Sequence, residues 1–334
     1  ATMARSRSIW GPYEEDPGNP VLTSDVENPE ELQKCGHADL VCTQNGEWYM
    51  VHLCARPPKG TRQCVLGRET AIQKMVWNEE GWLRLACGGR FGQWETEEPE
   101  GIAEYIFPED ERKDYGRDEF DVLSESDGVK TSALLDVRYT SLRQSYDSYA
   151  SLTECPGYLR LYGQESLNSC YNVSLIARRQ QARHVQVETS VDFAPTCREQ
   201  MAGLAYMYDT GNYYLLVKTR EEEFSSQTLD LKKPAKLRLI KSNHFDVEDV
   251  IPAISIPEDG PVYLRVITTQ EGLYAKFFYS LDGKDYQELA EVPTNILTDE
   301  QSEGFTGAHF GMYCHDMTGL RRYANFDYFE VVRK

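Results

Sequence analysis

The chain has 334 residues, enough for two domains that each bury their own core. Apolar residues make up 40% of it and aromatic residues 11%, which is typical of a globular protein rather than a disordered one. Its 35 basic and 54 acidic residues leave a net charge of −19, so the surface repels phosphate backbones and we expect no nucleic acid partner. No apolar run approaches the roughly 18–20 residues that a membrane span needs, and we expect no membrane association.

The nine cysteines include no C-x-x-C pair, so the sequence supports neither a zinc ribbon nor a thioredoxin-type motif. An odd number leaves at least one free thiol unless two chains are joined, and we interpret most of them as single buried thiols in strands. This interpretation slightly favours a reducing, cytoplasmic location, and the first residues show no signal-peptide pattern. The glycosylation sequon Asn172-Val173-Ser174 keeps an extracellular location open.

The first elements that the sequence predicts are short antiparallel strands, over roughly the first 95 residues. Residues 38–53 predict a hairpin around Asn45-Gly46, with a type I′ turn because both residues tolerate a positive φ. Residues 69–86 predict a second hairpin around a turn that ends in Gly81.

The character of the chain changes between residues 101 and 117, where charged residues and proline predict a linker. From residue 118 onward the predicted strands are longer. Residues 185–193 alternate between apolar and polar with a period of two, which predicts an antiparallel strand with one buried face. Further runs of this kind predict a β-sandwich of the jelly-roll or lectin type over residues 118–334. These runs are 263–267, 274–280 and 323–332.

The first domain is short for the fold that its hairpins suggest. A β-propeller blade takes roughly 40–50 residues, so this region could supply about two blades. Propellers close with roughly four or more blades, and two alone would leave open sheet edges and an uncovered apolar side. If the region belongs to a propeller, we expect the remaining blades to come from another segment or chain.

Several segments resemble the β-xylosidases of glycoside hydrolase family 43, in the order in which that family carries them. In the first domain these are residues 3–14 (MARSRSIWGPYE), 19–24 (NPVLTS), 36–41 (GHADLV) and 66–73 (LGRETAIQ). In the second they are residues 157–163 (GYLRLYG), 305–308 (FTGA) and 326–329 (FDYF). The resemblance covers essentially the whole chain.

This resemblance implies an all-β fold. Residues 1–100 would form the C-terminal part of a five-bladed β-propeller, residues 101–117 a linker, and residues 118–334 a concanavalin-like β-sandwich. It also implies that the family's general-base Asp, its general-acid Glu and a third Asp that tunes the acid lie upstream of Ala1. We therefore expect no catalytic residue in this chain, and expect it to be inactive without an N-terminal fragment or chain that completes the propeller.

Arg68 is the strongest candidate for substrate binding and follows Gly67 at the start of a predicted strand. A guanidinium offers five fixed donors that suit vicinal hydroxyls, and its charge lowers the pKa of nearby carboxyl groups. By resemblance, Arg68 contacts the sugar in the subsite where cleavage occurs. The alternative is a structural ion pair with Glu69 or another acid, although neighbouring strand residues point to opposite faces.

Two further residues gain roles from the resemblance. His37 would point down the propeller axis, near a bound Ca²⁺ or a water cluster, either as a metal ligand or as its neighbour; calcium prefers oxygen ligands, and the alternative is a hydrogen-bonded core histidine. Phe305 would reach from the sandwich to form a wall of the sugar pocket, limiting it to one or two sugar units, and its alternative is ordinary core packing.

The resemblance implies an inverting, exo-acting β-xylosidase that releases xylose from xylo-oligosaccharides, a step of xylan degradation. An α-L-arabinofuranosidase or bifunctional enzyme is one alternative, and a non-catalytic carbohydrate-binding protein is another. The expected partners are the xylo-oligosaccharide and the N-terminal portion, and a homo-oligomer is left open. Apart from Ca²⁺ at the propeller axis, no cofactor is implied, and in particular no organic cofactor.

Overall fold

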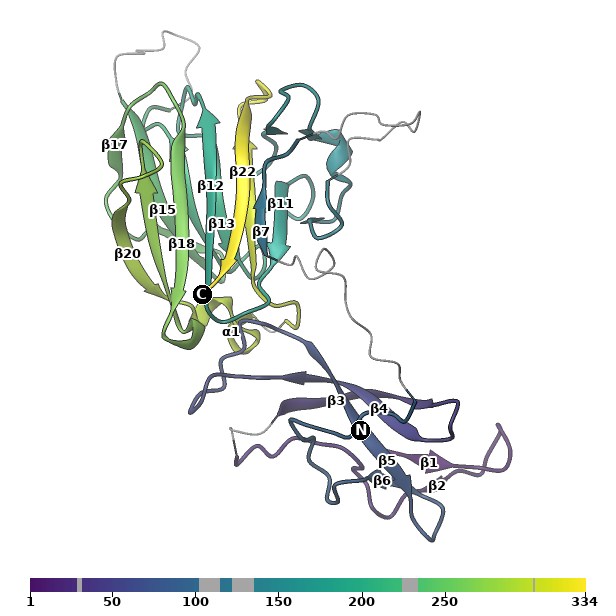
Figure 1. The fold of residues 1–334 in the computed structure, drawn as a ribbon. Coiled ribbons are helices and arrows are strands. Elements are labelled where there is room, and N and C mark those ends of the chain that lie inside the picture. Colours follow the sequence, from purple (N-terminus) through teal and green to yellow (C-terminus); the bar gives the residue numbers. More distant parts are fainter. Residues whose placement is uncertain (29–31, 102–114, 122–134, 224–233, 303) are drawn as a thin grey trace. The chain divides into compact units, whose positions relative to one another are not determined.

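The computed structural model describes residues 1–28, 32–101, 115–121, 135–223, 234–302 and 304–334. The chain forms two compact units, Ala1–Pro108 and Glu109–Lys334, each with its own hydrophobic core (Figure 1). Within the described ranges nearly all regular structure is strand, and the one α-helix, α1 (Asp299–Ser302), has four residues. The all-β class predicted from the sequence is confirmed.

The strands of unit 1 are β1 (Ala4–Arg5), β2 (Glu14–Glu15), β3 (Gln33–Cys42), β4 (Trp48–Ala55), β5 (Glu69–Trp77) and β6 (Leu83–Leu85). They form a two-stranded ribbon, β1-β2, and a four-stranded antiparallel sheet in the order β3-β4-β5-β6. Leu53 of β4 pairs with Gly36 of β3 and with Thr70 of β5, so the two predicted hairpins share one sheet. The described part of unit 1 therefore holds one blade-like sheet, where its length suggested about two.

Both hairpins of this sheet close with the same kind of turn. The Gly46 N–H donates to the carbonyl of Thr43 at 3.0 Å, and the Gly81 N–H donates to the carbonyl of Asn78 at 3.0 Å. Gly46 and Gly81 have φ of 82° and 76°. The predicted type I′ turn is wrong, because Asn45 does not share the positive φ that this turn requires. In each observed turn only the last residue has a left-handed conformation, which glycine adopts without steric cost.

The core of unit 1 lies on one face of the four-stranded sheet. Met50, Met75 and Leu83 project from three of its strands and pack against Val21 and Leu22 of the N-terminal segment. All five side chains are buried. The N-terminal segment thus acts as the second layer that an amphipathic sheet needs.

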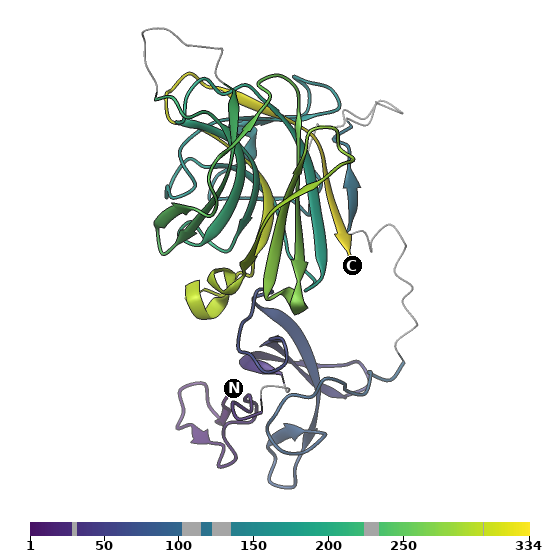
Figure 2. The ribbon, with the colours of Figure 1, turned by 90° about the vertical axis from the view of Figure 1, so that its left-hand side faces the viewer.

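Unit 2 is a sandwich of two antiparallel sheets with eight strands each (Figures 1 and 2). The strands of the first sheet are β7 (Gly116–Asp118), β9 (Ala150–Ser151), β10 (Leu159–Tyr162), β12 (Val185–Phe193), β18 (Val262–Thr269), β19 (Tyr274–Ser280), β20 (Gln287–Pro293) and β22 (Tyr323–Arg333). Those of the second are β8 (Thr140–Ser141), β11 (Ser174–Arg179), β13 (Gln200–Met207), β14 (Tyr213–Thr219), β15 (Ala235–Asn243), β16 (Asp246–Asp249), β17 (Ile254–Ile256) and β21 (His309–Asp316).

The strand order of the first sheet is β20-β19-β18-β12-β22-β10-β9, with β7 paired to β22. That of the second is β16-β15-β14-β13-β21-β11-β8, with β17 paired to β15. The main core of the unit lies between the two sheets, and the predicted β-sandwich is confirmed.

The predicted strand over residues 185–193 has the same bounds as β12, which lies between β18 and β22. Val187 and Val191 on its inner face belong to the core, as the alternation indicates. On its outer face Glu188 is also buried, because its carboxylate accepts hydrogen bonds from Arg265 and Tyr328. An ion pair therefore covers part of the face for which the pattern predicts solvent exposure.

The boundary between the two units, after Pro108, falls inside the predicted linker over residues 101–117. Residues 102–114 lie outside the described residues. Gly116 to Asp118 pair with β22 as strand β7, so the end of that segment belongs to a sandwich sheet.

No helix within the described ranges is long and apolar enough to cross a membrane. The nine cysteines all carry free thiols. Four of them are buried, namely Cys54, Cys64, Cys197 and Cys314.

Candidate functional site

Strand β3 departs from regular pairing at two adjacent places near its beginning. Against β4, the register shifts between Gln33 and Gly36 and again between Gly36 and Asp39. Each shift inserts one extra residue into β3, and Lys34 and His37 have positive φ of 56° and 46° in these two bulges. β-Bulges re-aim side chains and are over-represented beside functional sites.

His37 is exposed in the second bulge, so it is not a core histidine. Among the residues that the structure describes, no group of three or more His, Cys, Asp or Glu side chains is placed to hold a metal ion. Ca²⁺ takes six to eight oxygen ligands, which include backbone carbonyls and water, so the described side chains around His37 would not hold one by themselves.

Arg68 directly precedes β5 and is exposed. The shared pairing partner Leu53 aligns Gly36 of β3 with Thr70 of β5. His37, which follows Gly36, therefore lies opposite the middle of β4, whereas Arg68 lies at the end of the sheet where β5 begins. The structure thus places an accessible imidazole and an accessible guanidinium on two strands of one blade that are separated by β4.

The residues next to Arg68 in the sequence, Gly67 and Glu69, have structural roles. Gly67 has a φ of 65°, a left-handed conformation that glycine adopts without steric cost. The Glu69 carboxylate accepts hydrogen bonds from Nε of Arg56 at 3.0 and 2.9 Å, and a third from Nη2 of the same guanidinium. Glu69 is therefore the ion-pair partner of Arg56, and a pair of Arg68 with Glu69 would have to compete with this bidentate contact.

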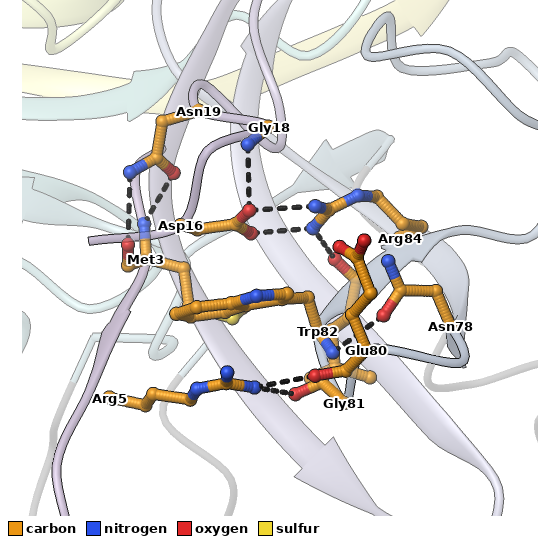
Figure 3. Close-up of polar contacts among 11 residues, drawn as sticks. Met3, Arg5, Asp16, Gly18, Asn19, Asn78, Glu80, Gly81, Trp82 and Arg84 are labelled. Carbon is orange, nitrogen blue, oxygen red and sulfur yellow. Dashed lines mark hydrogen bonds and ion pairs between the residues drawn. The ribbon is translucent and has the colours of Figure 1, made fainter. Parts of the chain in front are cut away.

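A second charged cluster of unit 1 ties the N-terminal segment to the sheet (Figure 3). The buried carboxylate of Asp16 accepts hydrogen bonds from Nη1 and Nη2 of Arg84, on β6, at 2.5 and 2.7 Å, and from the Gly18 N–H at 2.8 Å. A Cβ atom on Gly18 would lie 2.5 Å from Nη2 of Arg84, so this ion pair requires the glycine. The hydrogen bond from Arg84 lowers the pKa of Asp16 below its usual value of 3.8.

Arg5 extends this cluster on the other side. Its guanidinium lies 3.9 Å from the centroid of the Trp82 ring and donates to two carbonyl oxygens of the β5-β6 turn at 2.7 and 3.0 Å. These donors and acceptors bind one another, and Figure 3 shows that they join the N-terminal segment to the β5-β6 hairpin. We assign the cluster a structural role.

Phe305 belongs to unit 2, in the loop between α1 and β21. It is 47% exposed, so the alternative of ordinary core packing is wrong. The backbone on its C-terminal side is fixed, since the Gln180 N–H donates to the carbonyl of Ala308 at 2.8 Å. Of the three residues singled out in the sequence, His37 and Arg68 belong to the same sheet, and Phe305 lies in the other unit.

Two family models match this chain. The model of glycosyl hydrolases family 43 matches residues 1–83, and that of the beta xylosidase C-terminal concanavalin A-like domain matches residues 131–332, more than half of the chain. The chain belongs to glycoside hydrolase family 43. The resemblance read from the sequence is confirmed, and the fold combines propeller sequence with the family's concanavalin-like sandwich.

Individual members of family 43 match along the entire chain. A beta-xylosidase of Bacillus subtilis is 37% identical over 353 residues, which cover 100% of this chain and 60% of the relative. A non-reducing-end alpha-L-arabinofuranosidase of Bacteroides ovatus is 30% identical and covers 98% of this chain and 56% of its own length. The crystal structure of a xylan beta-1,4-xylosidase from Bacillus halodurans superimposes with a TM-score of 0.86 at 36% identity, over 100% of this chain and 60% of that one. This chain thus spans about 60% of the length of such relatives.

Three features of this family 43 chain could not be predicted from its sequence. The pairs Asp16–Arg84 and Arg56–Glu69 join residues that are far apart in the sequence, and no local spacing marks them. The contact of Tyr208 with Asp299, which lies beside the Phe305 loop, spans 91 positions. The one local signal was Gly304 and Gly307 around Phe305, because two glycines so close together indicate an irregular loop with tight backbone contacts.

Proposed function

We propose that this chain is the C-terminal portion of an inverting, exo-acting β-xylosidase that releases xylose from xylo-oligosaccharides. The observation that carries the proposal is the placement of Arg68, an accessible guanidinium at the end of a propeller blade in a family 43 chain. The similarity to xylosidases along the entire chain supports the same conclusion.

Arg68 would bind the sugar in the subsite where cleavage occurs. Its fixed fork of N–H donors can bind two neighbouring hydroxyl groups at once, which holds the ring in one orientation. Its positive charge also lowers the pKa of nearby carboxyl groups, which keeps a general base ionised near neutral pH.

The proton transfers would come from the portion of the enzyme that this chain does not span. In an inverting glycosidase one carboxylic acid protonates the leaving oxygen while a carboxylate activates water, with the two carboxyl groups roughly 6.5–9.5 Å apart. We propose that these groups lie in the N-terminal portion and that this chain alone is inactive.

The partly exposed face of the blade supports a partner of this kind. Val41 pairs with Tyr49, and Ile72 pairs with Val51, so these residues lie on the face opposite Met50 and Met75. Three β-branched side chains on this face are 41–46% exposed, namely Val41, Ile72 and Val76. Exposed apolar side chains on one face of a sheet favour burial against a further sheet, which the missing blades would supply.

Phe305 would supply an apolar ring to the sugar pocket. The exposed phenyl group of Phe305 keeps apolar surface in contact with water, which is unfavourable unless a ligand or another surface covers it. The C–H groups of a sugar ring can cover such a surface. The ring would also exclude bulk water from the reacting groups. We propose that His37 lies near a Ca²⁺ or a water cluster at the propeller axis, with oxygen ligands that the described side chains do not supply by themselves.

A second candidate is an α-L-arabinofuranosidase or an enzyme that accepts both sugars. The observation that favours it is the Bacteroides ovatus relative, whose similarity also extends over 98% of this chain. Arg68 does not separate the two, because both sugars offer neighbouring hydroxyl groups.

The test combines this chain with the part of the Bacillus subtilis relative that it does not match. We expect no cleavage of aryl β-xyloside or xylobiose by the chain alone and cleavage by the combination. Arg68→Ala should reduce kcat/KM of the combination by about 10²–10³-fold, as expected for the loss of donors to a reacting sugar, with an unchanged Tm. Rates on an aryl α-L-arabinofuranoside, measured in parallel, distinguish the second candidate.

The control is Arg56→Ala, which removes a guanidinium from the same end of the sheet without removing the proposed sugar contact. It should lower Tm more than Arg68→Ala does and reduce kcat/KM less. Full activity of the chain alone would contradict the placement of the acid and base elsewhere. Sugar binding by the combination without hydrolysis would favour a non-catalytic carbohydrate-binding protein instead.

A further inference from the structure

The loop from Gly304 to Ala308 is fixed at several points while the Phe305 side chain within it is exposed. The Gln180 N–H holds the carbonyl of Ala308 at 2.8 Å. Nδ1 of His309 lies 3.0 Å from the carbonyl oxygen of Gly307, which can only accept, so this nitrogen carries the proton. Burial lowers the pKa of His309, which keeps the imidazole neutral in this contact.

Tyr208 packs against the other end of the same loop. It follows β13 directly, is 4% exposed, and is tied to the next turn by its N–H, which donates to the carbonyl of Asn212 at 3.0 Å. A Cβ atom on Gly304 would lie 2.8 Å from Cε1 of Tyr208, so the loop backbone touches the ring and requires glycine there.

The Tyr208 hydroxyl joins this loop to the preceding helix. It donates a hydrogen bond to Oδ1 of Asp299, the buried first residue of α1. Burial and this hydrogen bond raise the pKa of Tyr208, and hydrogen bonding to the Gly307 backbone and the Thr306 side chain opposes the shift. Tyr208 therefore lies between α1, which its hydroxyl contacts, and Gly304, which the edge of its ring contacts.

We propose that Tyr208 and Asp299 are positioning residues, which hold the loop so that Phe305 is presented to the sugar. The proposal rests on the proposed function, since it takes Phe305 as part of the sugar pocket. Gly304, Gly307 and Ala308 of the loop each contact a fixed neighbour, whereas the phenyl ring of Phe305 is exposed. A ring held in place before the sugar binds spares the entropy of ordering it during binding.

The first arm of the test measures amide hydrogen exchange on the full chain and needs no activity. Tyr208→Phe keeps the ring and removes the hydroxyl, and we expect exchange at residues 304–308 to become about tenfold faster, as the loss of one buried hydrogen bond allows. Asp299→Asn should act in the same direction. The matched control is Tyr149→Phe, because Tyr149 is equally buried and donates to the carbonyl of Leu175 at 2.9 Å instead. Unchanged exchange at residues 304–308 in Tyr208→Phe would overturn the proposal.

The second arm uses the active combination and xylobiose. Tyr208→Phe should raise KM about five- to tenfold with kcat changed less than twofold, and Tyr149→Phe should leave both unchanged. In a Phe305→Ala background, Tyr208→Phe should have no additional effect, because the ring that it positions is gone. An undiminished effect in that background would overturn the positioning role.

The two arms separate this proposal from the proposed function. If Phe305→Ala leaves KM unchanged in an active enzyme, the role of Phe305 in the pocket is wrong, and positioning it cannot serve the sugar. If Phe305→Ala raises KM and Tyr208→Phe does not, the pocket role stands and the positioning role is wrong.

Discussion

The two units of the chain bury their apolar strands to different extents. In the sandwich each sheet covers the inner face of the other, and side chains such as Phe277, Phe310 and Phe326 are almost completely buried between them. In the blade the N-terminal segment that carries Val21 and Leu22 covers one face of the sheet, and on the opposite face Tyr49 is buried and donates a hydrogen bond to the carbonyl of Glu97. The opposite face leaves several β-branched side chains nearly half exposed.

This difference shows which unit can stand by itself. An amphipathic sheet becomes stable by burying its apolar face against a second layer, and the sandwich contains both of its layers. The blade has one covered face and one that is only partly covered, and it is also the unit that carries Arg68 and His37. We therefore expect most of the folding free energy of the chain to come from the sandwich, and the end of the blade that carries Arg68 to depend on a further sheet.

The largest effect should come from the sandwich core. Phe277 on β19 is fully buried and lies beside Tyr214, with 5.8 Å between ring centroids. Phe277→Ala should cost about 4 kcal/mol of unfolding free energy because it leaves a cavity between the sheets. Scanning calorimetry should record a decrease of about 10 °C in the Tm of the sandwich transition.

The control for this substitution is the next residue of the same strand. Phe278 points to the other face of β19 and is only half-buried, so Phe278→Ala should cost less than half as much. Equal losses for both variants would mean that the space between the two sheets is not the dominant core.

A smaller effect is expected from the ion pair that attaches the N-terminal segment to the blade. Asp16→Asn should destabilise the blade by about 3 kcal/mol, because it leaves Arg84 partly buried without its partner. Since Arg84 lowers the folded-state pKa of Asp16, the stabilisation is present above pH 4 and is lost as the pH falls below 3.8. Urea denaturation at pH 7 and pH 3 should thus give a difference between wild type and Asp16→Asn that shrinks at the lower pH.

The exposed pair Arg5–Glu14 provides the comparison for that measurement. Both side chains are largely exposed, and Glu14→Gln should change the unfolding free energy by less than about 1 kcal/mol. If Glu14→Gln proves as costly as Asp16→Asn, burial is not what distinguishes the two pairs.

The sequence predicted those parts of the fold that depend on neighbouring residues. The period of two over residues 185–193 gave β12 with the correct bounds, since alternation and strand burial express the same geometry. The glycines at 46 and 81 marked both hairpin turns. The type of turn was missed, because a single left-handed glycine serves a different turn from the one that the Asn-Gly dipeptide suggested.

Features that depend on pairing between distant residues could not be predicted from the sequence. The union of the two hairpins into one sheet requires β4 to pair with β5, and the bulges at Lys34 and His37 arise only from the register against β4. The residues of the candidate site came from the family resemblance rather than from spacing. Their accessibility, and the packing of Tyr208 against the Phe305 loop, depend on tertiary contacts that no local pattern encodes.

The smallest effect on the unfolding free energy is expected at the partly exposed face of the blade. The same kind of substitution in the sandwich core provides the comparison. Val76→Thr replaces a methyl group by a hydroxyl at a side chain that is 46% exposed, and it should change the unfolding free energy of the chain by less than about 0.5 kcal/mol. Val187→Thr makes the same change in a fully buried side chain and should cost about 1–3 kcal/mol, because the hydroxyl lies in an apolar core.

Although Val76→Thr should hardly change the stability of the chain alone, it should raise the concentration of the N-terminal portion that is needed to restore the proposed xylosidase activity, since a polar group then faces the sheet that the N-terminal portion would add. A loss of stability in the chain alone that matches Val187→Thr would mean that this face of the blade is already covered, and the comparison between the two units would then fail.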